Sequence, residues 1–181
     1  MLQHRFESAL SFAVFLEQAQ ANAAFWRDTY RLARVPADAA TRLASIRGRW
    51  HLLVLVEDWC GDAVNTVPLL ARLAELAPNV DLRVMGRDQN ADLMDAHLTN
   101  GARSIPVVMV LDEDYEERAC WGPRPSALQQ WVVDEGLAMQ RGERYRHVRT
   151  WYARDRGRTT VNEVIAAIAQ AAEDVGATAA A

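Results

Sequence analysis

The residue of this sequence best suited to covalent chemistry is Cys60, which stands where a buried strand is predicted to give way to a helix. The free amides and the macrodipole of a helix start favour negative charge, so they lower the pKa of a thiol and increase its reactive thiolate form. Trp59 supplies a flat apolar wall, and Gly61 leaves room for a partner's backbone or sulfur. The carboxylates of Asp58 and Asp62 act against the thiolate. We therefore expect a moderately lowered Cys60 pKa and a nucleophilic thiol, with an inert core cysteine as the alternative.

A second chemical feature is the pair Ile105-Pro106, which directly precedes a predicted strand. A proline that begins a strand after the turn at Asn100-Gly101 is a candidate for a cis peptide bond. In the cis form the backbone of Ile105 would be free to pair with an extended substrate beside the helix start. The alternative is an ordinary trans proline at the start of a strand.

The hydrophobic pattern of the middle of the chain predicts the elements that position these residues. The predicted strands cover residues 50–56, 80–85, 107–111 and 116–121, and the predicted helices cover residues 60–77, 89–98 and 126–139. The first strand, WHLLVLV, is continuously apolar, as is typical of a strand covered on both faces. The order β-α-β-α-β-β-α predicts an α/β domain with parallel strands first and a hairpin last.

A helical segment is predicted before this domain. Residues 1–48 carry apolar and aromatic residues at helical spacing, and Pro36 opens a second short helix that ends at Gly48. We expect these aromatic side chains to pack on the following domain, and a ligand pocket is the alternative.

The segment after residue 141 is rich in arginine, with aromatic residues between the arginines. Such a mixture can mark a nucleic-acid or anion surface. Because Glu143 and Asp155 lie among the arginines, we interpret the segment as a solvated, partly packed connector. A last helix is predicted over residues 160–175, with Thr160 and Glu163 as its capping box.

Composition excludes several classes of protein. The chain has 181 residues, all 20 of its basic residues are arginine, and its net charge is −4. The absence of lysine excludes Schiff-base chemistry and a phosphate-loop lysine, and the acidic balance argues against wrapping of nucleic acid. No apolar stretch approaches the roughly 20 residues that span a bilayer, so no membrane partner is expected.

The two cysteines and four histidines add two expectations. Two widely separated cysteines fit a reducing cytoplasm, where thiols stay free. The histidines are scattered over different predicted elements, so no spacing predicts a metal site or a general base for Cys60. They are His4, His51, His97 and His147.

Four spaced features together resemble the thioredoxin superfamily. They are the run Trp59-Cys60-Gly61-Asp62-Ala63 at a strand-to-helix junction, Pro68 within that helix, Ile105-Pro106 before a strand, and Gly122 at the end of the hairpin strand. The resemblance implies an α/β thioredoxin fold, a three-layer α/β/α sandwich with a central mixed sheet, over residues 49–141. Residues 1–48 would form an N-terminal helical extension, and residues 142–181 a connector and helix packed on the same domain.

A narrower resemblance points to a bacterial thioredoxin-like subfamily with a WCGDA motif, which is described mostly by its fold. The stretches that carry it are 57–63, 93–106, 121–125 and 151–153. Within the motif, the resemblance makes Cys60 the nucleophile, Trp59 the wall, Gly61 and Asp62 the helix-start amides, and Ile105-Pro106 the edge where a substrate docks.

This chain departs from thioredoxins in two places. Ala63 stands where they carry a second, resolving cysteine, and Val54 stands where they carry a buried aspartate. A protein built this way can form a mixed disulfide but cannot release it from within the motif. The resemblance therefore implies a monothiol redox protein, without a bound cofactor, that acts on protein or small-molecule thiols and disulfides.

Two routes could complete its reaction, and a third possibility involves no reaction at all. Glutathione or another small thiol, as co-substrate, could resolve the mixed disulfide. Cys120 could resolve it, because strand alternation puts Cys120 and Gly122 on one face, and the pair Cys60–Cys120 would then also suit a redox sensor. Alternatively, the site only binds a partner peptide along Ile105-Pro106, without turnover. The sequence indicates no oligomeric state.

Two arginines are predicted at the rim of the site. Arg103 precedes Ile105-Pro106, and Arg124 follows Trp121-Gly122. Either could stabilise the thiolate or hold a carboxylate of a tripeptide thiol. Equally, either could pair with Asp58 or Asp62 and only neutralise that charge.

Overall fold

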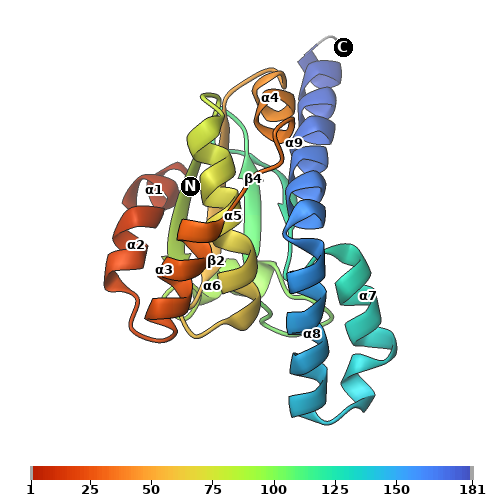
Figure 1. The fold of residues 1–181 in the computed structure, drawn as a ribbon. Helices are drawn as coiled ribbons and strands as arrows, with labels where there is room; N and C mark the ends of the chain where they lie inside the picture. The colour runs from red at the N-terminus through yellow and green to blue at the C-terminus, as the bar shows by residue number, and fades with distance from the viewer. Residues whose placement is uncertain (1, 180–181) are drawn as a thin grey trace.

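A five-stranded mixed sheet forms the centre of the computed structural model, which describes residues 2–179 (Figure 1). The strands run in the spatial order β1-β3-β2-β4-β5. Their bounds are β1 Leu10–Ser11, β2 Trp50–Val56, β3 Val80–Gly86, β4 Val107–Leu111 and β5 Glu117–Trp121. β3 pairs in parallel with β2, whereas β1, β4 and β5 are antiparallel to their neighbours.

The central strand β2 positions the site, because the chain leaves it at Val56 and reaches Cys60 four residues later. All seven residues of β2 are buried, with β3 on one side and β4 on the other. The continuously apolar run therefore reflects a strand covered on both faces, and this prediction is confirmed.

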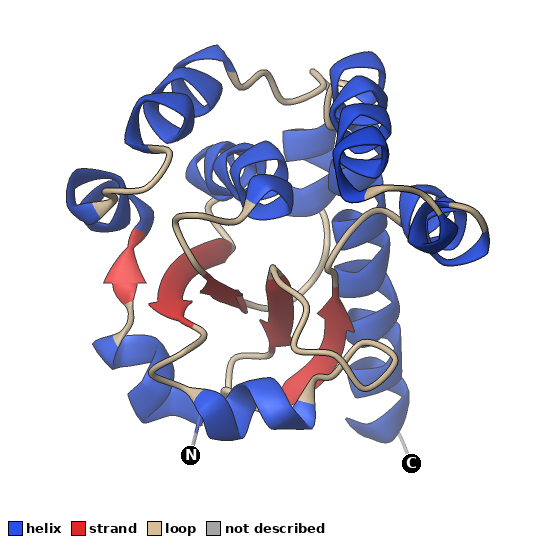
Figure 2. Ribbon diagram, turned by 90° about the horizontal axis from the view of Figure 1, so that it is seen from below, coloured by secondary structure: helices blue, strands red, loops and turns tan. Residues whose placement is uncertain are grey.

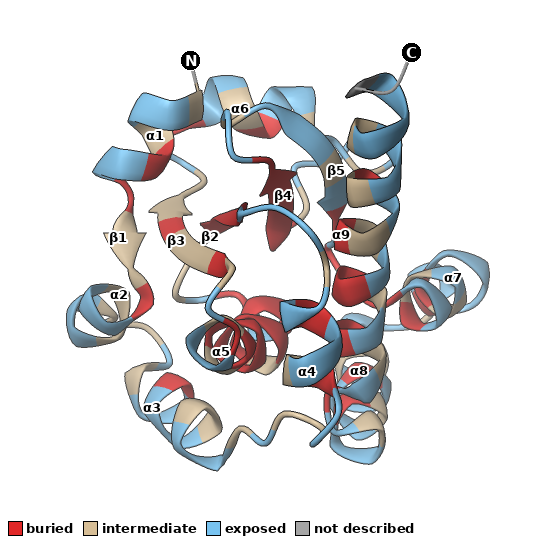
Figure 3. Cartoon of the chain, turned by 90° about the horizontal axis from the view of Figure 1, so that it is seen from above, coloured by how far each residue is buried: buried red, intermediate tan, exposed pale blue. Residues whose placement is uncertain are grey.

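Helices cover both faces of the sheet (Figures 2 and 3). α5 lies with α4 and α9 on one face, and α1 and α6 lie on the other. The bounds are α1 Leu2–Ser8, α2 Phe12–Gln18, α3 Ala23–Leu32, α4 Ala39–Ala44, α5 Gly61–Leu76, α6 Ala91–Ala96, α7 Ser126–Asp134, the short η1 Gly136–Ala138, α8 Arg141–Asp155 and α9 Arg158–Ala179. The predicted three-layer α/β/α arrangement with a mixed sheet is confirmed. Within residues 2–179, no helix is both long and apolar enough to cross a bilayer.

The N-terminal segment is helical, as predicted, except for one addition. Leu10 and Ser11 interrupt the helices and pair with Val84 and Arg83 at the edge of the sheet. The helical aromatics pack inward: Trp26 is fully buried, and its ring lies against the rings of Phe12 and Phe15.

The arginine-rich segment, predicted as a solvated and partly packed connector, is a helix, α8, and most of its residues are exposed. Val148 and Tyr152 are its buried residues, so the helix packs on the rest of the chain through a narrow apolar stripe. Figure 1 shows α8 beside α7, at the end of the molecule away from the C-terminus. The predicted N-terminal extension includes residue 1, and the predicted C-terminal segment includes residues 180 and 181; these three lie outside the described residues.

The predicted capping box at Thr160 and Glu163 is also wrong, because α9 begins two residues earlier, at Arg158. Asp155, the last residue of α8, accepts a hydrogen bond from the amide of Thr159 in the first turn of α9 (3.1 Å). Glu163 reaches across to another element: its carboxylate accepts hydrogen bonds from Trp121 Nε1 (2.8 Å) and from the amide of Ser126 at the start of α7 (2.9 Å).

Gly122 marks a close approach of two backbone segments next to the site. Its φ is +132°, and a Cβ atom built on it would lie 2.2 Å from the carbonyl oxygen of Pro106. Both the backbone angle and the lack of space require glycine here.

We predict that Gly122→Ala lowers the free energy of unfolding by about 2 kcal/mol or more, because the methyl group forces the two backbone segments apart. Chemical denaturation of both proteins measures the difference. Gly176→Ala is the matched control: Gly176 lies in α9 with no atom near its added Cβ, so that variant should be unchanged or slightly more stable. Equal stabilities for Gly122→Ala and the unaltered protein would contradict the constraint.

Candidate functional site

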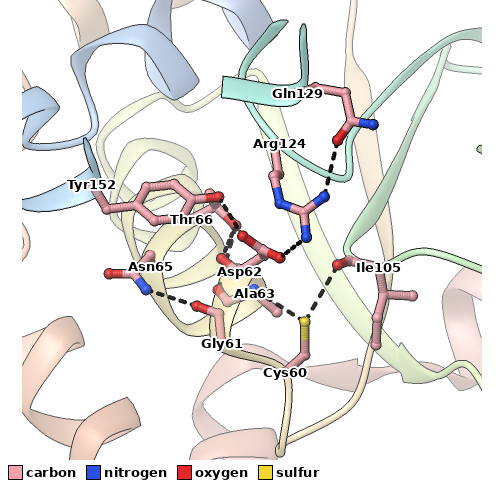
Figure 4. Close-up of polar contacts among 10 residues, drawn as sticks. All are labelled: Cys60, Gly61, Asp62, Ala63, Asn65, Thr66, Ile105, Arg124, Gln129 and Tyr152. Carbon is pink, nitrogen blue, oxygen red and sulfur yellow. Dashed lines mark hydrogen bonds and ion pairs between the residues drawn. The ribbon is translucent and has the colours of Figure 1, made fainter. Parts of the chain in front are cut away.

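Cys60 is the N-cap residue of α5, and its sulfur occupies the start of that helix (Figure 4). The amide of Ala63 donates a hydrogen bond to Sγ (3.5 Å), and the thiol donates one to the carbonyl oxygen of Ile105 (3.3 Å). The residue is only 6% exposed. The structure thus brings together Cys60 and Ile105-Pro106, the two features that the sequence singled out.

The peptide bond between Ile105 and Pro106 is cis, and both residues are buried. The Ile105 carbonyl accepts the thiol hydrogen of Cys60, so this part of the expected docking edge is engaged within the chain while the thiol is protonated. A ligand that uses this carbonyl must displace the thiol hydrogen.

Asp62 faces away from the sulfur's hydrogen-bond partners and into a buried polar network (Figure 4). One carboxylate oxygen accepts a hydrogen bond from Arg124 Nη2 (2.5 Å), and the other accepts one from the Tyr152 hydroxyl (3.0 Å). Arg124 also donates to Gln129 Oε1 (2.9 Å). The network joins α5, the loop after β5, and α8. Of the two alternatives for Arg124, the structure has the ion pair with Asp62.

Burial raises the pKa of Cys60, so the expected lowering is wrong. The amide of Ala63 opposes this rise, as a helix start should, but the negative charge of Asp62 adds to it and Arg124 offsets it only in part. The helix start and the neighbouring carboxylate act on the Cys60 pKa as predicted. The loss of hydration was not predicted, because the sequence does not show that Cys60 is nearly covered.

Burial likewise raises the pKa of Asp62, against the lowering by Arg124 and Tyr152. The pKa of Tyr152 is raised by burial and by the neighbouring Asp62 carboxylate, so this phenol stays protonated and continues to donate its hydrogen bond.

Arg103 and Asp58, both predicted near the sulfur, bind other partners, whereas Trp59 keeps its predicted place beside the sulfur. Arg103 makes two hydrogen bonds to Asp95 (2.7 Å each), so its expected place at the site is not observed. The carboxylate of Asp58 accepts hydrogen bonds from the amides of residues 20 and 21, which fixes the N-terminal extension to the site loop. Trp59 is half exposed, with the guanidinium of Arg87 5.0 Å from its ring centre.

An open cleft of about 520 Å³ lies over the sulfur. One wall is the predicted run Trp59 to Asp62, and the other is the start of α8. The lining residues from α8 are Arg141, Gly142, Tyr145 and Arg149. These four residues were not predicted to belong to the site. The available signal was the four-residue spacing of Arg141, Tyr145 and Arg149, which places them on one helical face.

Cys120 is not paired with Cys60, and both cysteines are free. Its sulfur lies within 4.8 Å of ligand atoms of His97 and Glu117, and it is not among the described residues that line the cleft. The neighbouring residue Trp121 points toward Glu163 of α9, so Cys120 faces the opposite side of the sheet.

A family model described as "Thioredoxin" matches residues 9–144 of this chain. The chain belongs to the thioredoxin family. The match covers the helical extension from residue 9, the whole sheet and the first residues of α8. It therefore includes Cys60, the cis Ile105-Pro106 bond and two of the α8 residues that line the cleft, Arg141 and Gly142.

Two solved structures share the fold of this thioredoxin-family chain. A Pseudomonas aeruginosa protein of unknown function, PA1234, is 25% identical, with a TM-score of 0.68 over 92% of this chain and 95% of that one. An HIV epitope-scaffold protein is 23% identical, also with a TM-score of 0.68, over 92% of this chain and 96% of the other. The search of curated proteins found no match.

We predict that the two members of the buried ion pair shift the pKa of Cys60 in opposite directions. Asp62→Asn removes a negative charge and should lower the Cys60 pKa, and Arg124→Gln removes a positive charge and should raise it. Thiolate ultraviolet absorbance followed against pH, in a Cys120→Ser background, measures both.

Arg103→Gln is the control for the loss of an arginine near the predicted site, because Arg103 pairs with Asp95 at the surface. It should leave the Cys60 titration unchanged. Shifts in the same direction for the Asp62 and Arg124 variants would contradict the electrostatic account.

Proposed function

We propose that this protein is a thiol–disulfide redox protein of the monothiol type, with Cys60 as its only nucleophile. The observation that carries the proposal is the seat of the sulfur at the start of α5, between the Ala63 amide and the Ile105 carbonyl and beneath an open cleft. An amide aimed at the sulfur stabilises the thiolate once the proton has left, and the cleft gives a disulfide room to approach.

The proposed reaction begins with loss of the Cys60 proton. In a mixed disulfide between the substrate and a small thiol, the thiolate attacks the sulfur of the small thiol. That S–S bond breaks, a new one forms between Cys60 and the small thiol, and the substrate's sulfur leaves and takes up a proton. A second molecule of the small thiol then attacks the bond at Cys60 and is oxidised to its own disulfide, which restores the Cys60 thiol. The substrate disulfide is reduced, and the small thiol supplies the electrons.

The cleft favours an anionic small thiol. Arg141 and Arg149 line it with exposed side chains, and neither forms an ion pair with another residue of the described chain. Tyr145 and Trp59 add flat surfaces to the lining of the cleft. Two guanidinium groups beside a sulfur suit a thiol that carries carboxylates, such as the tripeptide glutathione.

We also propose that the chain belongs to the thioredoxin-like subfamily with the WCGDA motif. We further propose that it works in a reducing cytoplasm, which is consistent with its two free cysteines.

A second candidate function is a non-catalytic module that binds a partner peptide at the same cleft. The observation that favours it is the covered, protonated thiol: Cys60 is 6% exposed, and burial raises its pKa. The redox-sensor alternative, a Cys60–Cys120 disulfide, has less support. Cys120 faces the side of the sheet opposite α9 and lies with His97 and Glu117 rather than along the cleft.

The monothiol proposal predicts which cysteine carries the adduct. After incubation with oxidised glutathione, the native chain should gain one glutathione on the peptide that contains Cys60. Cys120→Ser should gain it equally, whereas Cys60→Ser should lose the adduct at that peptide. Peptide mass spectrometry makes the measurement. The absence of an adduct on Cys60 at any pH would contradict the monothiol proposal and favour the non-catalytic binding module. A mass loss of two protons without an adduct would support the redox sensor.

The raised pKa predicts how the rate depends on pH. Below the pKa of Cys60, each unit of pH increases the thiolate fraction about tenfold. The rate constant for mixed-disulfide formation should therefore rise about tenfold from about pH 7 to about pH 8 and still be rising at pH 9, since the pKa lies above its ordinary value of 9.0. A rate that levels off near neutral pH would contradict the effect of burial.

The arginines of α8 should confer selectivity for charge. Replacing Arg141 and Arg149 with glutamine should slow the reaction with oxidised glutathione about threefold or more, the order expected for exposed ion pairs. The matched control is an uncharged disulfide of similar size, whose rate should change little. Equal effects on both disulfides would show that the arginines do not recognise carboxylates.

A further inference from the structure

A second group of chemically active side chains lies on the face of the sheet that carries α6. His97 follows the last residue of α6, and Glu117 and Cys120 belong to β5, the edge strand of the sheet. One donor atom of each residue lies within 4.8 Å of the other two, namely an imidazole nitrogen, a carboxylate oxygen and the Cys120 sulfur. None of the three belongs to the cleft over Cys60.

An irregularity in β5 explains how two of these residues share a face. Val110 pairs with Ala119, but the next residue, Leu111, pairs with Glu117, so Arg118 is an extra residue on the edge strand. In a regular strand, residues three apart point to opposite faces. The bulge at Arg118 removes one step of this alternation and turns Glu117 to the side of Cys120.

The orientation of His97 is the independent observation that points to a cation. Its Nδ1 lies 2.7 Å from the carbonyl oxygen of Leu93, and its Nε2 lies 2.8 Å from Glu117 Oε1. Both ring nitrogens thus face acceptors. A neutral imidazole has one N–H, so the second contact requires either a second proton or a cation shared by Nε2 and the carboxylate. A histidine that donates Nδ1–H to a backbone carbonyl has the arrangement usual for a metal ligand bound through Nε2.

We propose that His97, Glu117 and Cys120 form a Zn²⁺ site, with solvent as the fourth ligand. Imidazole nitrogen, thiolate sulfur and carboxylate oxygen are the donors that zinc takes in proteins, whereas magnesium and calcium prefer oxygen alone. Zn–N and Zn–S bonds of about 2.0–2.3 Å place tetrahedral ligands about 3.5 Å apart. Small side-chain rotations reach that value: the 2.8 Å between His97 Nε2 and Glu117 Oε1 widens, and the longer separations, up to 4.8 Å, shorten. Such rotations are open to Cys120 and Glu117, which lie at the surface.

The site goes beyond the redox function proposed for Cys60 and does not depend on it. Zinc would hold Cys120 as a thiolate bound to the metal, and it would tie the end of α6 to the edge strand. The chemical class of the ligand is a borderline-soft divalent ion, so Co²⁺, which accepts the same donors and tetrahedral geometry, can report on the site.

The test is a titration of the tag-free chain with Co²⁺, followed by displacement with Zn²⁺. We expect one equivalent of Co²⁺ to bind and to give a sulfur-to-cobalt charge-transfer band, which stoichiometric Zn²⁺ abolishes. Cys60→Ser should keep the band, Cys120→Ser should lose it, and His97→Gln should weaken binding about tenfold or more. Circular dichroism of each variant checks that the fold is intact.

Several outcomes would overturn the proposal. They are the absence of a charge-transfer band in the native chain, a band that disappears in Cys60→Ser but persists in Cys120→Ser, and Co²⁺ affinity unaffected by His97→Gln. Each would mean that His97 and Glu117 form only an ion pair between a protonated imidazole and a carboxylate.

Discussion

The buried ion pair between Asp62 and Arg124 is the interaction on which the surroundings of Cys60 depend. It joins the first turn of α5 to the loop after β5, and the Tyr152 hydroxyl ties the same carboxylate to α8. Three segments that are distant in sequence thereby meet at one carboxylate. Removing one partner of such a pair leaves a buried charge uncompensated, which costs several kcal/mol. The wall of the cleft that α8 contributes is held in place in part by this contact.

Burial is the largest influence on the pKa of the Cys60 sulfur, and the same ion pair modifies that effect. A helix start and a nearby arginine both favour the thiolate, yet burial and the Asp62 carboxylate outweigh them and raise the pKa of Cys60. The resting site is thus a covered thiol that donates its hydrogen to Ile105. In the proposed function, a thiol poised this way reacts sparingly with general oxidants, and its reaction depends on a disulfide that the cleft can hold against it.

The sequence predicted those parts of the fold that local patterns encode. The strands at 50–56 and 107–111 were predicted to the residue, because an apolar run with turn residues at both ends defines a buried strand. The pairing of Leu10 with the sheet edge, the bulge at Arg118 and the contact between Glu163 and Ser126 were not predicted, since each depends on a partner distant in sequence. At the site, Cys60 and Ile105-Pro106 were found from type and position. The choice of Arg124 over Arg103, and the wall from α8, follow only from how the helices pack.

The most direct test of the central claim is the redox equilibrium of the native chain in glutathione buffers. If Cys60 forms a mixed disulfide, one glutathione is taken up and one released, so the oxidised fraction depends on the ratio of oxidised to reduced glutathione. At a fixed ratio it should then be unchanged when total glutathione is varied, with the adduct on the Cys60 peptide. An oxidised fraction that falls as total glutathione rises would indicate a Cys60–Cys120 disulfide, and the absence of any oxidation at Cys60 would contradict a redox role for this site.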